Sequence, residues 1–484
     1  MTSTRSFLVC RRLGDAFRAA RWAVLAAVLA NTDWAAAQSE LVPQNLARRV
    51  GLERAWVSQV QMDKTKYKVT GTTLSLVQDR ASNPEQHDLL LLQTNHGFLQ
   101  ALDAENGRTV WQQQIGDRDF LNLPAASSDK VVVVLNGQVM LALDRSNGHV
   151  LWEKRLLRVP SQQPAVDSRV VHVPHFSGHV TSYQLPNSVA NVETDEIVRA
   201  KEERVYLSFG SIDVPPLFTR QSLAWATSRG FVFVASPDLG SVRFRFETNR
   251  AISAPLAYWT PLVLAASRDG YLYAIDEMSG EARWQFTTGH AIGQRPAAID
   301  GAVYITPDIG GMYCLGVDAG LERWFVPRIT QFVAASKDRV YATDNLQRLV
   351  VLDAASGGQL AQLPIDPLAK KLMNTQNDRI YMVTAGGLVQ CLHEIGAAQP
   401  IVHVIPEPVA PQDKFKKGKK PKKAADDEDE DAEDEDEDAM EDEGDDEDAD
   451  DEDVISDDEE MEDEGMEDEG MEDEEMDDAE DPLE

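Results

Sequence analysis

Three histidines that lie close together in the chain are the first candidates for chemistry. His172, His175 and His179 fall within the stretch VHVPHFSGH. Imidazole nitrogens bind zinc and other transition metals, but this spacing matches no diagnostic ligand pattern. In a continuous strand His172 and His175 point to opposite faces, and only a bend at Pro174 or Gly178 would bring them together. We therefore assign no catalytic, cofactor-binding or metal-binding residues, and a metal site at these histidines stays the alternative.

The cysteines and the remaining motifs give no candidate nucleophile. Cys10 lies in the N-terminal leader, while Cys314 and Cys391 lie in strand-like segments of two repeats that are not neighbours. We expect the last two to be small buried hydrophobic residues and not a disulfide. No glycine-rich phosphate loop and no nucleophile elbow occurs in a context that could use it. The residue types therefore favour a protein that is not an enzyme.

A repeated hairpin must position all of these residues. Its best copy is Asp269 to Phe286, DGYLYAIDEMSGEARWQF. The first half alternates with apolar side chains on both faces, as in a strand that is covered on both sides. Asp276 and Gly280 then bracket a tight turn, because Asp hydrogen-bonds to turn backbone and Gly adopts a positive φ at little cost. A second strand follows and places Trp284 at its centre.

The same spacing recurs along the chain. Counted from Gly270, the frame has Asp at +6, Gly at +10 and Trp at +14. Eight complete or degraded copies start at residues 97, 138, 178, 230, 270, 310, 347 and 387, at intervals of 41, 40, 52, 40, 40, 37 and 40 residues. A period of about 40 residues made of strands and turns is typical of a β-propeller with one four-stranded sheet per repeat.

The two ends of the repeat array together complete one blade. The last copy, around Gly387, ends before its tryptophan-bearing strand, and an unpaired strand of this kind, RAWVSQVQM, lies at Arg54 to Met62. Placing Trp56 in the outer strand of the last blade joins the two ends and removes a free sheet edge. The predicted fold class is therefore all-β, an eight-bladed β-propeller, with seven blades as the alternative.

The repeat resembles the PQQ-like β-propeller repeat in the stretches GFLQALDAENGRTVW, GYLYAIDEMSGEARW and MLALDRSNGHVLW. Among eight-bladed propellers the chain is most similar to the BamB family, lipoproteins of the outer-membrane β-barrel assembly machine, between residues 50 and 395. The resemblance implies a non-catalytic scaffold or protein-binding platform in the cell envelope. BamB proteins carry a lipidated Cys where the leader is cleaved, whereas Cys10 lies ahead of the apolar run, so we expect no lipid anchor.

Quinoprotein dehydrogenases share this fold and supply the enzymatic alternative. They carry an adjacent Cys-Cys pair and a Trp that covers the quinone, and this chain has no Cys-Cys pair. Trp111, Trp152, Trp284 and Trp324 lie at the position of the repeat where blades pack, so we expect a structural role for them. A quinone-dependent dehydrogenase-like protein is the alternative function, and we expect no cofactor.

The N-terminal part is typical of an exported protein. Residues 1–37 contain five Arg, then an apolar run from Trp22 to Ala30, then three Ala before Gln38, which predicts a cleaved secretory signal peptide. An uncleaved leader or a transit peptide is the alternative. We therefore expect an exported protein of the periplasm or cell envelope.

The propeller itself is predicted at residues 54–405, after an N-terminal extension at residues 38–53. In the extension Leu46, Ala47 and Val50 have helical spacing, and we expect them to pack on the propeller. The longest interval between repeats contains a polar insertion, VANVETDEIVRAKEER, which we expect to project from one face. It is either a solvated loop or a partner contact, since insertions in repeat arrays often map to the binding face.

The C-terminal part has a different composition. Residues 406–425 form a Pro/Lys-rich linker, with seven Lys from Lys414 to Lys423. Residues 426–484 contain 42 Asp or Glu and no Lys or Arg, so they account for all of the net charge of −36. A like-charge run of this kind cannot bury a core and is predicted to be a disordered acidic tail.

The tail provides a third function class, a protein that binds cations or basic proteins. Divalent cations should bind it weakly, because a flexible chain lacks the fixed oxygen cage of a tight site. We interpret the lysine block as a counter-charged hinge and expect no nucleic acid partner. The expected partners are proteins on a propeller face or edge, including envelope assembly factors, with peripheral membrane association through those partners.

Overall fold

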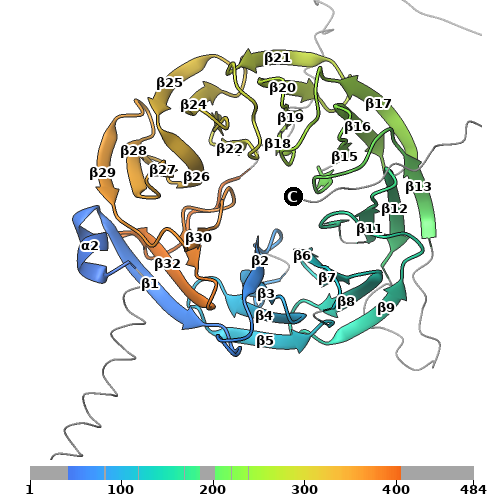
Figure 1. Cartoon of the computed structure of the whole chain (residues 1–484), viewed down its shortest axis with the longest axis horizontal. Coiled ribbons are helices and arrows are strands. Elements are labelled where there is room, and N and C mark those ends of the chain that lie inside the picture. The colour runs from blue at the N-terminus through green and yellow to red at the C-terminus, as the bar shows by residue number, and fades with distance from the viewer. Residues whose placement is uncertain are drawn as a thin grey trace, which may run out of the picture. The chain divides into compact units, whose positions relative to one another are not determined.

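The computed structural model is a ring of eight four-stranded antiparallel sheets, which we number as blades 1 to 8 in chain order (Figure 1). The structure describes residues 42–80, 83–117, 119–167, 169–185, 202–219, 221–237 and 239–404. The predicted leader, linker and acidic tail lie outside these residues, as does nearly all of the predicted insertion. The eight-bladed prediction is confirmed and the seven-bladed alternative is wrong.

In the first four blades the strands run in chain order from the ring axis outward. Blade 1 consists of β2 (Val69–Ser75), β3 (Leu89–Thr94), β4 (Phe98–Asp103) and β5 (Thr109–Gln114). Blade 2 consists of β6 (Asn122–Ser127), β7 (Val131–Asn136), β8 (Val139–Asp144) and β9 (Val150–Arg155). Blade 3 consists of β10 (Ala165–Val166), β11 (Val170–Pro174), β12 (His179–Gln184) and β13 (Glu202–Leu207). Blade 4 consists of β14 (Leu217–Phe218), β15 (Leu223–Ala226), β16 (Phe231–Ser236) and β17 (Ser241–Glu247).

The next four blades keep this order until the ring closes. Blade 5 consists of β18 (Ala257–Trp259), β19 (Leu262–Ala266), β20 (Tyr271–Asp276) and β21 (Ala282–Thr287). Blade 6 consists of β22 (Ala297–Ile299), β23 (Ala302–Ile305), β24 (Gly311–Gly316) and β25 (Glu322–Pro327). Blade 7 consists of β26 (Ile329–Ala335), β27 (Arg339–Asp344), β28 (Leu349–Asp353) and β29 (Gln359–Leu363). Blade 8 consists of β30 (Lys370–Lys371), β31 (Ile380–Val383), β32 (Leu388–Glu394) and β1 (Leu52–Gln59).

The N-terminal strand β1 closes the ring as the outer strand of blade 8, as predicted. It pairs antiparallel with β32, and Trp56 lies opposite Cys391. The strand begins at Leu52, two residues before the predicted start at Arg54, because Leu52 is itself fully buried and pairs with Glu394. Pairing strands from the two ends of the domain removes the edge that an incomplete blade would expose.

A short helix, α2 (Gln44–Arg49), precedes β1 and packs on the ring (Figure 1). Ala47 is fully buried in one cluster with residues of blades 7 and 8, and Leu46 and Val50 pack against that cluster. The apolar spacing of the predicted extension therefore marks a helix that contacts its own domain. No helix in the described part of the chain combines the length and apolarity needed to cross a membrane.

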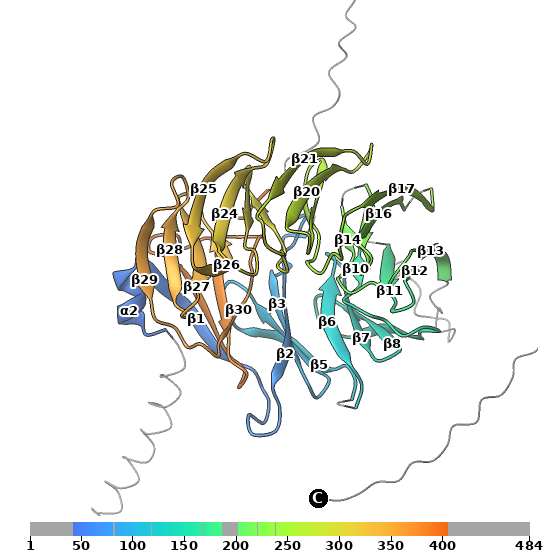
Figure 2. The ribbon, with the colours of Figure 1, turned by 45° about the horizontal axis from the view of Figure 1, so that its top comes forward.

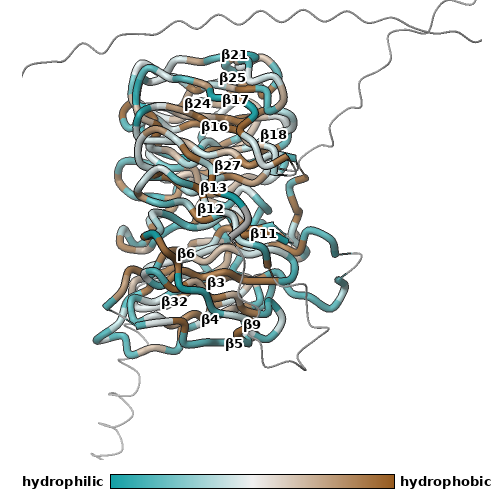
Figure 3. The backbone as a smooth tube through the Cα atoms, turned by 90° about the vertical axis from the view of Figure 1, so that its right-hand side faces the viewer, coloured by the Kyte–Doolittle hydropathy of each residue, from teal (hydrophilic) through white to brown (hydrophobic). Residues whose placement is uncertain are grey.

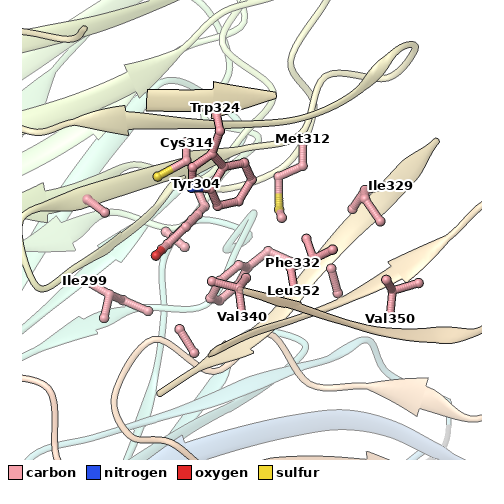
Figure 4. Close-up of a cluster of buried hydrophobic side chains, with 14 residues drawn as sticks. Ile299, Tyr304, Met312, Cys314, Trp324, Ile329, Phe332, Val340, Val350 and Leu352 are labelled. Atoms are coloured by element: carbon pink, nitrogen blue, oxygen red, sulfur yellow. The ribbon is translucent and has the colours of Figure 1, made fainter. Parts of the chain in front are cut away.

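Apolar residues on both faces of the inner strands pack neighbouring blades together. The eight hydrophobic clusters of the described residues each join two adjacent blades. In Figure 3 the tube is largely brown along β3 and largely teal along the outer strand β5, which follows the change from LLLLQT to TVWQQQ. Figure 4 shows the cluster between blades 6 and 7, where Tyr304, Met312 and Trp324 meet Phe332, Val340 and Leu352. Burial of this apolar surface is the main source of stability of the ring.

The Asp–Gly–Trp frame of the repeat forms a contact between blades. In blade 5 the Asp276 carboxylate accepts hydrogen bonds from the backbone N–H groups of Met278 and Ser279, at 2.9 and 3.0 Å. Gly280 then adopts a φ of 77°, which L side chains rarely adopt. The ring of Phe244 from the preceding blade lies directly against Gly280, so a Cβ there would overlap it. Glycine is thus required both by the turn and by the neighbouring blade.

At four other boundaries between blades the residue over the glycine is tryptophan. The pairs are Trp56 on Gly107, Trp111 on Gly148, Trp284 on Gly320 and Trp324 on Gly357. Each indole N–H also donates to a backbone carbonyl of the same turn, at 3.1 Å to Ala104, 2.7 Å to Arg145, 2.7 Å to Val317 and 3.0 Å to Ala354. Trp152 occupies the same position in blade 2 and is buried. The predicted structural role of these tryptophans is confirmed.

The strands run between two loop-lined faces (Figure 2). We call one of them the linker face, because it carries the connections between blades. It also carries the turns between the second and third strand of each blade. These connections and turns hydrogen-bond to each other, as the Thr248 N–H does to the Gly230 carbonyl. The opposite face carries the other two kinds of turn in each blade. The last described residues cross the opposite face, where the His403 N–H donates to the Gln376 carbonyl at 2.8 Å and its Nε2 lies 3.1 Å from the Ala335 carbonyl.

Candidate protein-interaction site

The three histidines lie at different places in blade 3, and each contacts different residues. His172 lies in β11, is 1% exposed, stacks on Phe218 of blade 4 and hydrogen-bonds through Nδ1 to the Ser182 hydroxyl at 2.7 Å. His175 lies beyond the end of β11, and its Nδ1 is 3.3 Å from the Val159 carbonyl. His179 opens β12 and contacts Ser177. The three rings therefore do not converge.

Burial also changes the titration of two of these rings. It lowers the pKa of His172 to about 4 and, together with smaller effects of charged neighbours, the pKa of His175 to about 4. Both rings are therefore neutral at ordinary pH, which is the form that would bind a metal. However, no three His, Cys, Asp or Glu side chains of the described residues are grouped so that they could hold a metal ion. His172 and His175 are thus buried in blade 3, while His179 is only half-buried.

The two cysteines of the ring occupy equivalent positions in blades 6 and 8. Cys314 lies opposite Trp324, and Cys391 lies opposite Trp56. In the corresponding pairs of other blades the residue opposite the tryptophan is alanine, as at Ala274. Both thiols are free and buried, and burial raises the pKa of Cys314 to about 11 and that of Cys391 to about 12. The prediction of two small buried hydrophobic residues is confirmed, and neither thiol is a nucleophile near neutral pH.

The residues present do not fit a quinone cofactor. The tryptophans of the repeat frame are held between blades, where the indole N–H groups of Trp111, Trp284 and Trp324 bond to the next blade. Releasing one of them would expose a buried ring and leave the glycine below it without its contact. The described residues also include no grouped set of carboxylate ligands for a metal that would accompany the quinone.

Exposed apolar side chains gather on the linker face of blades 1 to 4. They are Phe120 (59% exposed), Leu121 (58%), Leu157 (79%), Phe176 (53%) and Phe209 (61%). We call these five residues the apolar surface. Three of the four strongly exposed phenylalanines in the described part of the chain belong to it, and aromatic residues are enriched where proteins bind proteins. Contiguous exposed apolar patches of this kind commonly mark interaction sites.

Adjoining loops hold the apolar surface in place. Phe120 and Leu121 lie in the connection from β5 to β6, where the Leu121 carbonyl accepts the Gly137 N–H. Leu157 lies in the connection from β9 to β10. In that connection the Ser161 N–H donates a hydrogen bond to the Pro174 carbonyl, next to the turn that carries Phe176. Rigid blades thus fix the loops from which these side chains project.

Phe209 lies at the third blade boundary of the surface, between blades 3 and 4. It lies in the connection from β13 to β14, and the neighbouring Ser208 N–H donates to the Gly178 carbonyl in the turn that carries Phe176. The Arg245 guanidinium is 6.0 Å from the centre of the Phe209 ring and 4.8 Å from that of Phe231. A cation placed over aromatic rings in this way stiffens the site and adds a polar rim to it.

Sequence reasoning did not identify this surface. It predicts partners on a propeller face or edge and names the insertion as a candidate contact, but it singles out none of the five residues. The linkers between blades carry isolated apolar residues, which hydrophobic periodicity does not detect. The repeat frame assigns each loop to one face of the ring. Large apolar residues in loops of the same face are therefore the sequence signal for this surface.

An eight-bladed ring of tightly packed sheets that presents an apolar loop surface defines a propeller scaffold. The chain belongs to the BamB family, because the family described as outer membrane protein assembly factor BamB matches residues 57–197 and 228–390, more than half of the chain. No curated protein gives a significant match to the sequence.

Solved structures with the same fold include proteins of very different roles. BamB from Moraxella catarrhalis has a TM-score of 0.54 and 15% identity, covering 71% of this chain and 97% of that one. The computationally designed Ika8 protein has a TM-score of 0.54 and 14% identity, with coverage of 69% and 98%. Quinohemoprotein alcohol dehydrogenase from Comamonas testosteroni has a TM-score of 0.51 and 12% identity, with coverage of 72% and 77%. At these identities the likeness is one of fold alone.

Proposed function

We propose that this protein is a non-catalytic scaffold of the cell envelope that binds protein partners in outer-membrane protein assembly. The observation that carries the proposal is the apolar surface on the linker face, held on a rigid ring. Membership of the BamB family supports the setting, an exported protein that works beside the outer membrane. The dehydrogenase alternative is not favoured, because the tryptophans of the repeat frame are engaged between blades.

The apolar surface fits a protein partner better than a small molecule. Its five side chains project from three successive boundaries between blades and from one turn within blade 3, so they present a broad face and not an enclosed cavity. Small-molecule sites are usually concave and bury most of their ligand. A partner that covers Leu157 and Phe209 would remove two well-exposed apolar side chains from water, which favours association.

The test compares matched substitutions on the two faces. Leu157 and Leu239 are both leucines that are 79% exposed, and Leu239 lies in the turn between β16 and β17 on the opposite face. We expect Leu157→Asp to reduce co-purification of outer-membrane assembly proteins by about tenfold or more, because truncating an interface anchor typically costs more than about 1 kcal/mol of binding free energy. The same substitution should lower the amount of folded outer-membrane β-barrel protein in cells. Leu239→Asp should leave both unchanged.

Two results would overturn the proposal. One is equal retention of the envelope partners by both leucine variants. The other is alcohol-dependent dye reduction by the purified chain after incubation with a quinone cofactor and Ca²⁺, which would place the protein with the dehydrogenases.

A further inference from the structure

Five arginines on the linker face of blades 4 to 7 have no partner. They are Arg229, Arg250, Arg268, Arg295 and Arg328, and we call them the arginine surface. All five side chains are exposed, and none of the guanidinium groups makes a hydrogen bond or ion pair with the described residues. By contrast, Arg283 and Arg348 pair with aspartates at 2.6 Å. Five arginines without such a partner thus lie on one face within four successive blades.

Three of them come from adjoining loops. The turn that carries Arg229 is tied to the preceding linker by Ser228 N–H and the Ser211 carbonyl. The Arg250 carbonyl accepts hydrogen bonds from Thr248 at 2.7 Å and from Ser267 at 3.1 Å. Ser267 opens the turn that carries Arg268. The backbone thus fixes three guanidinium groups along the boundary between blades 4 and 5.

Arg328 stands where the backbone would favour glycine. It is the only residue between β25 and β26, its φ is 64°, and its N–H and carbonyl bond to Gly310 and Asn345. A long side chain in the left-handed region is unfavourable, whereas glycine adopts it freely. Strain of this kind often accompanies a functional side chain. The loop geometry therefore does not explain the arginine, which points to a role for its guanidinium group.

Arg295 extends the surface toward the ring axis. It lies two residues before β22, the innermost strand of blade 6. Desolvation by the surrounding protein lowers its pKa from the ordinary value, although the side chain remains exposed. The guanidinium group keeps its charge and is open to an anion from solvent.

The neighbouring acidic groups balance only part of this charge. The aspartates among these loops are Asp213, Asp269 and Asp308, and the Asp269 carboxylate is already bonded to the Tyr273 hydroxyl at 2.8 Å and to the Tyr271 N–H at 2.9 Å. Exposed Ile309, at 66%, lies beside Asp308 on the same face. Arginines interleaved with apolar side chains are typical of protein interfaces, and the planar guanidinium pairs with carboxylates through two hydrogen bonds.

We propose that the arginine surface binds a carboxylate-rich segment of the protein partner. The inference rests on the proposed function and names the chemistry of the partner. The five cations come from separate loops of four blades, so they suit an extended acidic chain that runs along the face. A single phosphate group would engage only one or two of them. Charge complementarity would speed association and set the orientation of the partner beside the apolar surface.

The experiment measures binding of an acidic peptide to the full chain. The probe is a labelled peptide with the sequence of residues 461–475, MEDEGMEDEGMEDEE, and its control replaces every Glu by Gln and every Asp by Asn. The test variant carries Arg229→Gln, Arg250→Gln, Arg268→Gln and Arg328→Gln. The matched control changes four exposed basic residues of the opposite face, Arg108, Lys130, Arg169 and Lys337, to Gln. Both variants lose the same net charge.

We expect the acidic peptide to bind the unmodified chain, the affinity to fall with added salt, and the test variant to bind at least about tenfold more weakly. The control variant should bind as the unmodified chain does. Absence of binding to the full chain, equal loss in both variants, or binding of anionic phospholipid vesicles in place of the peptide would each overturn the inference. Retention of the envelope partner by the test variant would also overturn the inference about the arginine surface. If Leu157→Asp still loses that partner, the proposed function stands.

Discussion

At the scale of single residues, four boundaries between blades each depend on one tryptophan packed between two small residues. The indole of Trp56 lies between Cys391 of its own blade and Gly107 of the next, and its N–H bonds to the Ala104 carbonyl at 3.1 Å. Cysteine and alanine are interchangeable behind the tryptophan because both are small and apolar. The glycine is not interchangeable, since its positive φ and the overlying ring both exclude a Cβ.

Removing the ring of Trp56 should therefore destabilise the propeller strongly. Trp56→Ala removes a side chain that is 8% exposed and that packs at 6.2 Å from the ring centre of Tyr381. We expect a loss of about 3–5 kcal/mol in the free energy of unfolding, measured by urea denaturation. Phe325→Ala, at a site that is 39% exposed, should cost much less. Similar losses in both variants would contradict the role of Trp56.

A second substitution separates the turn from the contact above it. Gly107 and Gly301 have nearly the same φ, 73° and 75°, but only Gly107 lies under an aromatic ring, and nothing is within 4 Å of a Cβ at Gly301. Gly301→Ala should cost only the backbone penalty of about 1–2 kcal/mol. Gly107→Ala should cost clearly more in the same unfolding measurement, because the indole of Trp56 must move. Equal costs would show that the contact contributes nothing.

The buried His172 should make stability depend on pH. Burial lowers its pKa to about 4, so the folded state resists protonation, while the unfolded state binds a proton near the ordinary value of about 6.5. Its contribution to stability is therefore present above pH 6.5 and is lost as the pH falls toward 4. His172→Asn keeps an acceptor for the Ser182 hydroxyl and removes the titration.

We expect this variant to lose less of its stability between pH 7.5 and pH 5 than the unmodified protein does, as measured by urea midpoints. His149→Asn, which changes an exposed ring, serves as the control and should follow the unmodified protein. Identical pH profiles for both variants would contradict the assignment.

At the scale of elements, the sequence predicts the fold through the repeat and fails where the repeat is interrupted. Asp276, Gly280 and Trp284 recur at fixed offsets, so the hairpins, the blade count and the closing strand at Trp56 all follow from the spacing. The outer strand of blade 3 does not follow, because the insertion breaks the frame. Its residues from Glu202 onward belong to β13, although they were assigned to the insertion.

The structure gives a physical reason for this exception. In blade 3 the place of the tryptophan is taken by Arg204, whose guanidinium lies against Gly240 and donates to the Pro237 carbonyl. A charged residue that replaces an aromatic one in this way keeps the hydrogen bond to the next blade but leaves no hydrophobic signal in the sequence. The apolar and arginine surfaces were missed for a related reason. Both consist of loop residues that only the ring brings together.

At the scale of the whole molecule, the sequence divides into a nearly neutral repeat region and a strongly acidic C-terminal segment. Residues 426–484 hold 42 acids and no Lys or Arg. This predicted tail lies outside the described residues, so its properties stay predictions from composition. Repulsion between its carboxylates is screened within about 10 Å at 0.1 M salt, so we expect the full chain to contract as salt is added.

Deleting residues 426–484 should therefore leave the melting temperature of the propeller nearly unchanged, because a segment with so few apolar and so many acidic side chains cannot form a core. The change should instead appear in solubility and in salt-sensitive association. Thermal unfolding of the full and shortened chains at low and high salt provides the comparison. A large loss of thermal stability, or slow amide exchange within these residues in the full chain, would show that the segment is folded.

The central claim is that the linker face is where this protein binds its partners, and site-specific photo-crosslinking in living cells tests it most directly. A photoreactive phenylalanine analogue is placed at Leu157 or Phe209 on the linker face, and at Leu239 or Leu321 on the opposite face, all exposed positions. We predict crosslinks to envelope assembly proteins from Leu157 and Phe209 and none from Leu239 and Leu321. Crosslinks to these proteins from the opposite face alone would contradict the claim.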